Sequence, residues 1–251
     1  MYYEPGKTPH GLPFDPFKSC VVPRPIGWIS STSPDGVDNL APYSQFQNVT
    51  FDPPIVMFSA NQTMRRERKD SVVNIEKTGA FVWNMATFAL RDAVNLSAQD
   101  LPAEIDEFAI AGLTKAPSRL VRPPRVAESP IQFECSYLQT VRLPANGPIG
   151  TVDVVFGRVI AIHIADDALN AEGKIDITRL RPLARLGYYD YTDVDHSFTM
   201  MPVGGATAGA GLEGSPEKVA ALTVLGALQQ SRHRPAWERR RSSSTRSIRY
   251  P

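Results

Sequence analysis

The sequence predicts a mainly β protein built as an antiparallel barrel. Short apolar runs rich in β-branched residues recur between residues 25 and 165, with the alternation typical of strands. The chain has 22 prolines, many at the ends of these runs, where a residue without a backbone N–H is tolerated. Few long helical segments separate the runs, which favours an antiparallel barrel over a doubly wound parallel sheet.

The first half of the barrel follows from its turn residues. Residues 25–32 and 37–44 read as a hairpin, with Gly36 supplying the permissive backbone of the turn. After two prolines, residues 55–60 form a short buried strand, and residues 80–86 form a further strand.

Two short helices and a long hairpin complete the expected elements. The first helix covers residues 68–79, with Asp70 or Ser71 as the N-cap and Gly79 at its end. The second covers residues 87–99. Two long alternating runs, residues 131–143 and 151–166, are predicted to be joined by a hairpin loop that contains glycines.

Charge and cysteine content exclude several classes of protein. Residues 203–251 carry eight Lys and Arg against three acidic residues, so that residues 1–202 have a net charge of −4, unlike a nucleic-acid-binding domain. We therefore expect a domain at 1–202 and a disordered, low-complexity basic tail at 203–251. Cys20 and Cys135 read as buried free thiols. No stretch is apolar enough for a membrane span, so we expect a cytoplasmic protein.

Templates for metal or nucleophilic catalysis are missing from the sequence. The four histidines share no metal-ligand spacing, and no Walker A loop or G-x-S-x-G motif occurs. The acidic segment 190–196 reads as a polar loop after the last strand. We therefore predict no catalytic side chain and no metal.

A polar belt between two expected strands is the first candidate binding feature. If it lies at a barrel rim, its amides and hydroxyls can bind the edge of a flat heterocycle, while apolar neighbours contact its face. The belt comprises Ser44, Gln45, Gln47, Asn48 and Thr50.

The segment Arg65 to Ser71 is the second candidate. The start of the helix there offers backbone N–H groups and a positive dipole end, and Lys69 and Ser71 add donors suited to a phosphate. Taken alone the segment reads as a solvated charged turn, but together with the belt it indicates a site for a phosphorylated heterocycle.

These residues carry a resemblance to a known family. The segments "VVPRPIGWISSTSPDGVDNLAPYSQFQNVTFDPPIVMFS", "KDSVVNIEKTGAFVWNMA" and "RLGYYDY" resemble the flavin reductase-like, FMN-binding split-barrel family, over about residues 14–202. The resemblance implies a six-stranded antiparallel split barrel with Greek-key topology, forming a homodimer with one FMN per subunit near the interface.

The resemblance also implies which residues bind FMN. Ser44, Asn48 and Thr50 would contact the ring edge and the ribityl chain. The phosphate end would lie at the end of one strand and the start of the helix, with Arg24 as a weaker candidate for the same anion. These phosphate-end residues are Ser59, Ala60, Asn61, Lys69, Asp70 and Ser71.

One position departs from the pattern of some family members. Where these carry a His-x-Gly-x-Tyr-like segment near the nicotinamide site, this chain has Arg185 in place of the histidine. Tyr188, Tyr189 or Tyr191 could stack near a flavin or fill a dimer seam, and packing alone is an equal alternative.

The function implied is an FMN-dependent oxidoreductase that passes hydride from NADH or NADPH to flavin N5, with a monooxygenase as a possible partner. An FMN-binding carrier or sensor without turnover is the alternative. A third hypothesis makes the basic tail a nucleic-acid-binding element, which the charge of the preceding domain opposes.

Overall fold

The computed structural model describes residues 1–64, 68–147 and 150–200. The chain divides into two compact units, Met1–Ser197 and Phe198–Pro251, and all the described helices and strands belong to the first. The basic tail predicted at 203–251 lies outside the described residues. In the described part of the chain, no helix is both long and apolar enough to cross a membrane.

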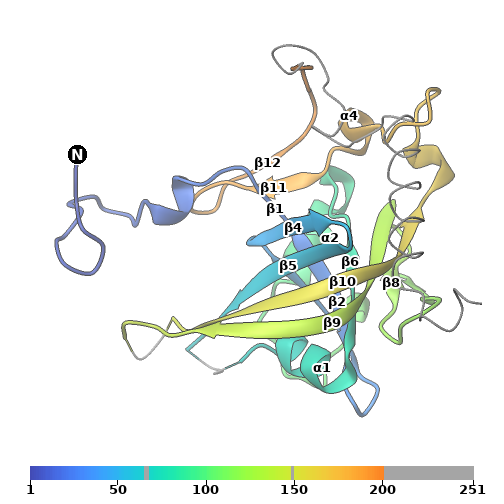
Figure 1. Ribbon diagram of the computed structural model, residues 1–251, viewed down its shortest axis with the longest axis horizontal. Coiled ribbons are helices and arrows are strands. Elements are labelled where there is room, and N and C mark those ends of the chain that lie inside the picture. The colour runs from blue at the N-terminus through green and yellow to red at the C-terminus, as the bar shows by residue number, and fades with distance from the viewer. Residues whose placement is uncertain (65–67, 148–149, 201–251) are drawn as a thin grey trace, which may run out of the picture. The chain divides into compact units, whose positions relative to one another are not determined.

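One antiparallel sheet of seven strands forms the body of the protein, in the order β3-β2-β6-β9-β10-β5-β4 (Figure 1). Its outermost strands, β3 and β4, are consecutive in the chain. The strands are β2 (Gly27–Thr32), β3 (Asp38–Tyr43), β4 (Phe46–Phe51), β5 (Pro54–Asn61), β6 (Ala80–Asn84), β9 (Ile131–Leu143) and β10 (Val152–Ile164).

The sheet curls so that its two edges approach each other. The Ser59 N–H of β5 donates to the Gln45 carbonyl between β3 and β4 at 2.8 Å, and the Tyr43 and Phe58 rings lie 4.7 Å apart. This confirms the predicted mainly β, antiparallel split barrel.

The predicted number of six strands is wrong by one. The additional strand is β4, whose Gln47, Asn48 and Val49 are exposed. Because amides are uncommon in strands, the sequence predicted a polar connection here rather than a strand. At the edge of a sheet, however, outward side chains can be polar, because they face water.

Two small antiparallel sheets accompany the barrel. β1 (Arg24–Pro25) pairs with β11 (Leu183–Arg185), and β11 pairs with β12 (Tyr191–Asp193). β7 (Lys115–Ala116) pairs with β8 (Arg125–Val126).

The predicted hairpins are both present. β2 and β3 pair from Gly27↔Tyr43 to Thr32↔Asp38, and Gly36 between them has φ 96°, in the region that favours glycine. β9 and β10 form the long hairpin, which extends beyond the other strands (Figure 1). A Cβ on Gly157 of β10 would lie 2.3 Å from the Phe81 ring, so this position requires glycine.

The first predicted helix is α1 (Asp70–Thr78), which packs against β2, β3, β6 and β9. It ends at Gly79 in the left-handed conformation, as expected. The predicted N-cap is wrong, because Lys69 occupies that position and Ser71 is buried against the barrel.

The remaining helices are short. The predicted helix at 87–99 is a 3-10 turn, Phe88–Leu90, followed by α2 (Arg91–Leu96). The others are α3 (Glu107–Ile110), α4 (Ile177–Leu180) and two further 3-10 turns, Phe17–Ser19 and Asp166–Ala168.

Two clusters of buried side chains hold the barrel together. The larger fills its interior and includes Phe58, Phe81 and Cys135. The smaller includes Trp28 and Phe108 and joins β2 and β3 to α2 and α3. β2 is buried over its full length because it separates the two clusters. The predicted burial of Cys135 is confirmed, but Cys20 is exposed, because it follows the 3-10 turn outside the barrel.

Candidate functional site

A cavity of about 410 Å³ opens where β1, the β3–β4 connection and β5 meet. We call it the barrel-rim cavity. Its walls are mostly apolar, with a few amides, hydroxyls and cations among them. It is lined by Phe17, Lys18, Val21, Pro23, Arg24, Pro25, Ser44, Gln45, Phe46, Gln47, Met57 and Ser59.

Ser44 and Ser59 line this cavity from two segments that the closure of the barrel brings together. Ser44 follows β3, and Ser59 lies near the end of β5. The backbone hydrogen bond from Ser59 to Gln45 fixes their spacing. Both serines are half-buried, as expected for groups at the mouth of a cavity.

Arg24 of β1 is the third predicted residue in the barrel-rim cavity. Its guanidinium donates to the carbonyls of Val21 at 2.9 Å and Leu186 at 2.6 Å, and to that of Lys18. Its Nε atom is buried and finds no hydrogen-bond partner among the described residues. Burial, and then the nearby Arg185, lower the pKa of Arg24. The site therefore holds a cation with an unused donor.

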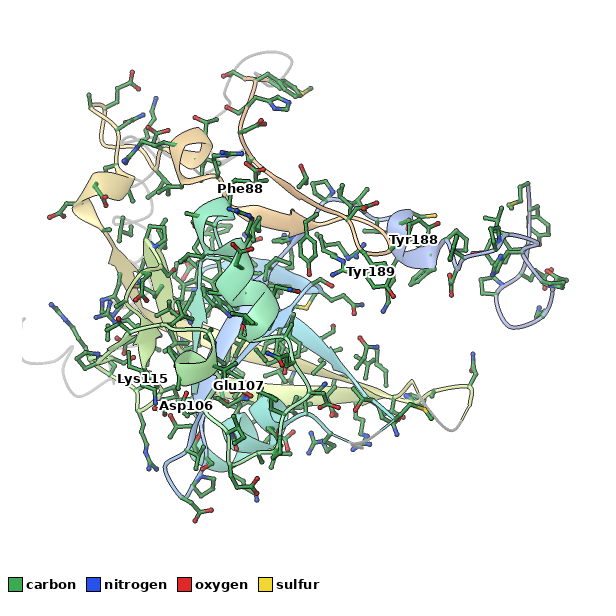
Figure 2. The ribbon with its side chains drawn as sticks, turned by 180° about the vertical axis from the view of Figure 1, so that it is seen from behind. Phe88, Asp106, Glu107, Lys115, Tyr188 and Tyr189 are labelled. Atoms are coloured by element: carbon green, nitrogen blue, oxygen red, sulfur yellow. The ribbon has the colours of Figure 1, made fainter. Side chains whose placement is uncertain are left out.

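A second cavity, of about 940 Å³, adjoins the first and shares four lining residues with it. We call it the arginine cavity, because both Arg24 and Arg185 line it. Figure 2 shows Tyr188 and Tyr189 next to each other, in the segment between β11 and β12. The lining residues are Phe14, Asp15, Phe17, Lys18, Ser19, Arg24, Ser44, Arg185, Tyr188 and Tyr189.

Four other predicted residues lie on β4 and β5 but line neither cavity. Asn48 is exposed on β4, and its Oδ1 accepts a hydrogen bond from Gln47 at 2.7 Å. Thr50 is half-buried next to the bulge of β4. Ala60 is buried in the core, and Asn61 is exposed at the end of β5.

The last three predicted residues lie at the start of α1, and none of them lines either cavity. The Lys69 Nζ lies 3.8 Å from the Asp100 carboxylate, and Asp70 is the first residue of the helix. The Ser71 hydroxyl is buried and donates to Asn39 Oδ1 at 2.6 Å. The structure thus brings Arg24, Ser44 and Ser59 together and leaves the α1 residues apart from them.

A buried hydrogen-bond network behind Ser71 was not apparent from the sequence. Asn39 donates to Glu107 Oε2 at 3.0 Å, and the Leu40 N–H donates to the same oxygen at 2.9 Å. Burial raises the pKa of the Glu107 carboxyl. Glu107 of α3 and the N-cap residue Asp106 lie near Lys115, away from Tyr188 and Tyr189 (Figure 2). Glu107, Asn39 and Ser71 therefore connect α3 to the start of α1 through β3.

Arg68, just before α1, is held by two acidic side chains. It makes bonds of 2.7 Å to both oxygens of Glu76 and one of 3.0 Å to Asp153. These partners raise the pKa of Arg68 and lower that of Glu76. Arg68 thus stabilises the approach to α1, and its charge is already paired.

Tyr188 and Tyr189 were candidates from the sequence, but the two phenylalanines that line the cavities with them were missed. Phe14 and Phe17 come from the segment before the barrel, whose sequence shows no periodicity. The Phe14 and Tyr188 rings meet edge to face, with centroids 5.6 Å apart. This contact joins the start of the domain to its end, which no local pattern can reveal. In the described part of the chain, no three His, Cys, Asp or Glu side chains form a metal-binding group.

The geometry agrees with the comparison to known families. The model of the flavin reductase like domain matches residues 19–192. This chain belongs to that family. The resemblance inferred from the sequence is confirmed. Most residues that line the barrel-rim cavity lie within the matched range, whereas Phe14, Asp15, Phe17 and Lys18 of the arginine cavity precede it.

Relatives and solved structures extend this result. An uncharacterized protein of Aquifex aeolicus is 36% identical over 171 residues, which cover 67% of this chain and 84% of that protein. Nitrilotriacetate monooxygenase component B from Bacillus cereus is 29% identical, with a TM-score of 0.72, covering 80% of this chain and 98% of that one. The 2-nitrobenzoate 2-nitroreductase NbaA of Pseudomonas fluorescens is 26% identical, with a TM-score of 0.64, covering 77% and 92%.

Proposed function

We propose that this protein is an FMN-dependent oxidoreductase that uses NADH or NADPH to reduce flavin bound in the barrel-rim cavity. The observation that carries the proposal is Arg24, which lines a cavity of a flavin reductase-like barrel and whose buried Nε donor has no partner among the described residues. A buried polar atom without a partner is rare unless a ligand completes it.

The lining of the barrel-rim cavity suits a flavin. Phe46, Met57 and Pro25 offer apolar surface for a flat ring, and the hydroxyls of Ser44 and Ser59 offer hydrogen bonds to its edge. These polar groups are few and lie on the rim of the barrel, as expected for a site that orients a planar heterocycle.

The phosphate of FMN would extend toward the start of α1. The dipole of this nine-residue helix favours an anion at its start, and Lys69 adds a positive charge. Because the Ser71 hydroxyl is bonded to Asn39, we assign contact with the phosphate to Lys69 and the backbone rather than to Ser71. Asn48, Thr50, Ala60, Asn61 and Asp70 remain predicted contacts.

When bound, FMN supplies the redox chemistry, accepting hydride at N5 from a nicotinamide. The chain needs no acid or base for this step, which agrees with the absence of a catalytic template in the sequence. Its own residues would bind and orient the flavin: the apolar wall would exclude water from one face, the serines would hold the edge, and Arg24 would contribute positive charge. We infer that the reduced flavin serves a separate monooxygenase, because a similar protein is a monooxygenase component.

We also propose a homodimer. β10 exposes Ile160, Ile162 and Ile164 at alternate positions, and Val49 and Phe51 of β4 are exposed on the other side of β5. Exposed apolar residues that gather on strands at the same edge region of a sheet mark an interaction surface. Ile162→Glu should convert a dimer to a monomer in sedimentation velocity. A wild-type protein that sediments as a monomer at micromolar concentration would contradict this proposal.

The decisive test is an absorption spectrum of the purified protein, followed by anaerobic titration with NADH and NADPH. We expect flavin bands with about one FMN per chain, and their bleaching by at least one nicotinamide. A yellow protein that neither nucleotide bleaches would instead be an FMN carrier or sensor. Protein that binds no FMN even when it is added in excess would refute the site.

A further inference from the structure

Two arginines that line the arginine cavity lie opposite each other across a strand pair. In the antiparallel register of β1 and β11, Arg24 is the direct partner of Arg185. Like charges placed directly opposite each other destabilise a strand pair. Burial lowers the pKa of Arg24, and the nearby Arg185 lowers it further.

No carboxylate among the described residues forms an ion pair with either guanidinium. Arg185 donates to the Tyr191 hydroxyl at 2.5 Å and to the Tyr188 carbonyl, and lies over the Tyr191 ring. Arg24 donates to backbone carbonyls only. Asp15 lines the same cavity, but its Oδ1 accepts from the Phe17 N–H at 2.9 Å. Neutral hydrogen-bond acceptors therefore orient both guanidinium groups, and no carboxylate in the described part of the chain neutralises their charges.

The rest of the cavity is suited to a planar molecule. Phe14, Phe17, Tyr188 and Tyr189 provide aromatic surface, and Lys18 adds a third cation. Tyr188 has φ 54°, an uncommon conformation for a non-glycine residue, and its carbonyl receives the Arg185 bond. The volume of the arginine cavity, about 940 Å³, is more than twice that of the barrel-rim cavity, and the two cavities adjoin.

We propose that the arginine cavity binds a second, planar substrate through an anionic group held between Arg24 and Arg185. This inference deepens the proposed function and rests on it for the role of the ligand, which would lie next to the flavin. Guanidinium groups bind both phosphate and carboxylate in bidentate geometry. The anion could thus be a phosphate of the nicotinamide dinucleotide or the carboxylate of an aromatic acid.

The test uses the full-length protein and the variant Arg185→Gln, with Arg119→Gln as the control. Arg119 is exposed and lines neither cavity, so its substitution removes the same charge elsewhere. Calorimetric titration with pyrophosphate and with benzoate measures the affinity for each anion. Michaelis constants for NADPH and NADH are measured in the same three proteins. Circular dichroism and bound FMN confirm that each variant is folded.

We expect Arg185→Gln to weaken binding of at least one anion about tenfold or more, as for loss of a charge-assisted hydrogen bond, and Arg119→Gln to leave it unchanged. A loss confined to pyrophosphate, with a raised NADPH Michaelis constant, identifies the dinucleotide phosphate. A loss confined to benzoate identifies an aromatic acid.

Anion affinity that is unmeasurable in the wild type, or equal in wild type and Arg185→Gln, would overturn the inference. Failure of the proposed function gives a different result. In that case the protein binds no FMN, while its affinity for pyrophosphate or benzoate still depends on Arg185.

Discussion

The barrel-rim cavity and the start of α1 both gather polar side chains, but they satisfy them differently. At the start of α1, the Ser71 hydroxyl is 1% exposed and bonded to Asn39, which is in turn bonded to Glu107. In the cavity, Arg24 keeps a buried donor for which the described residues offer no partner. Polar groups that are satisfied internally stabilise the fold, whereas an unused donor in a cavity is available to a ligand.

The sharpest test of this contrast is Glu107→Ala. Its removal leaves the Asn39 amide and the Leu40 N–H without their buried acceptor. We expect the free energy of unfolding to fall by about 3 kcal/mol, measured by urea denaturation. The exposed Glu104, three residues earlier, provides the control Glu104→Ala, which should change stability by less than about 0.5 kcal/mol. Equal effects of the two substitutions would show that the network is not structural.

The next largest effect concerns Lys69. If the start of α1 holds the FMN phosphate, Lys69→Ala should weaken FMN binding by about 1.5–3 kcal/mol, the value of a charge-assisted hydrogen bond. Its contact with Asp100, at 3.8 Å and partly exposed, contributes little to stability. Lys77→Ala, at the other end of the same helix, is the control. Unchanged affinity in a fluorescence titration of Lys69→Ala would remove α1 from the site.

Substitution of the two cavity serines should lower FMN affinity and leave stability unchanged, whereas Glu107→Ala should lower stability. The double variant Ser44→Ala, Ser59→Ala loses two neutral hydrogen bonds to the flavin, so FMN affinity should fall by about 1–3 kcal/mol. Stability without FMN should barely change, because these hydroxyls face a cavity. Ser136→Ala on β9, which lines neither cavity, is the control. A loss of stability without a loss of FMN affinity would reverse our assignment.

Much of this arrangement could be predicted from the sequence, and the failures have physical causes. Gly36 and Gly79 mark a turn and a helix end through local backbone requirements, so both were found. The family resemblance implied Ser44 for the ring edge and Arg24 and Ser59 for the phosphate end, and barrel closure brings all three to one cavity. The inward hydrogen bond of Ser71 depends on Asn39, 32 positions away, and no local pattern reports such a partner.

The smallest expected effect is the pH dependence that Glu107 adds to stability. Its pKa is raised in the folded state, so the folded protein retains a proton that the unfolded chain has released. Stability therefore declines as pH rises from the ordinary glutamate pKa, about 4.3, to the raised value, by at most about 1.4 kcal/mol per pH unit. Glu107→Gln has no proton to lose, and its stability should lack this decline. Urea denaturation of both proteins between about pH 4 and 8 measures the difference, and parallel curves would show that Glu107 titrates normally.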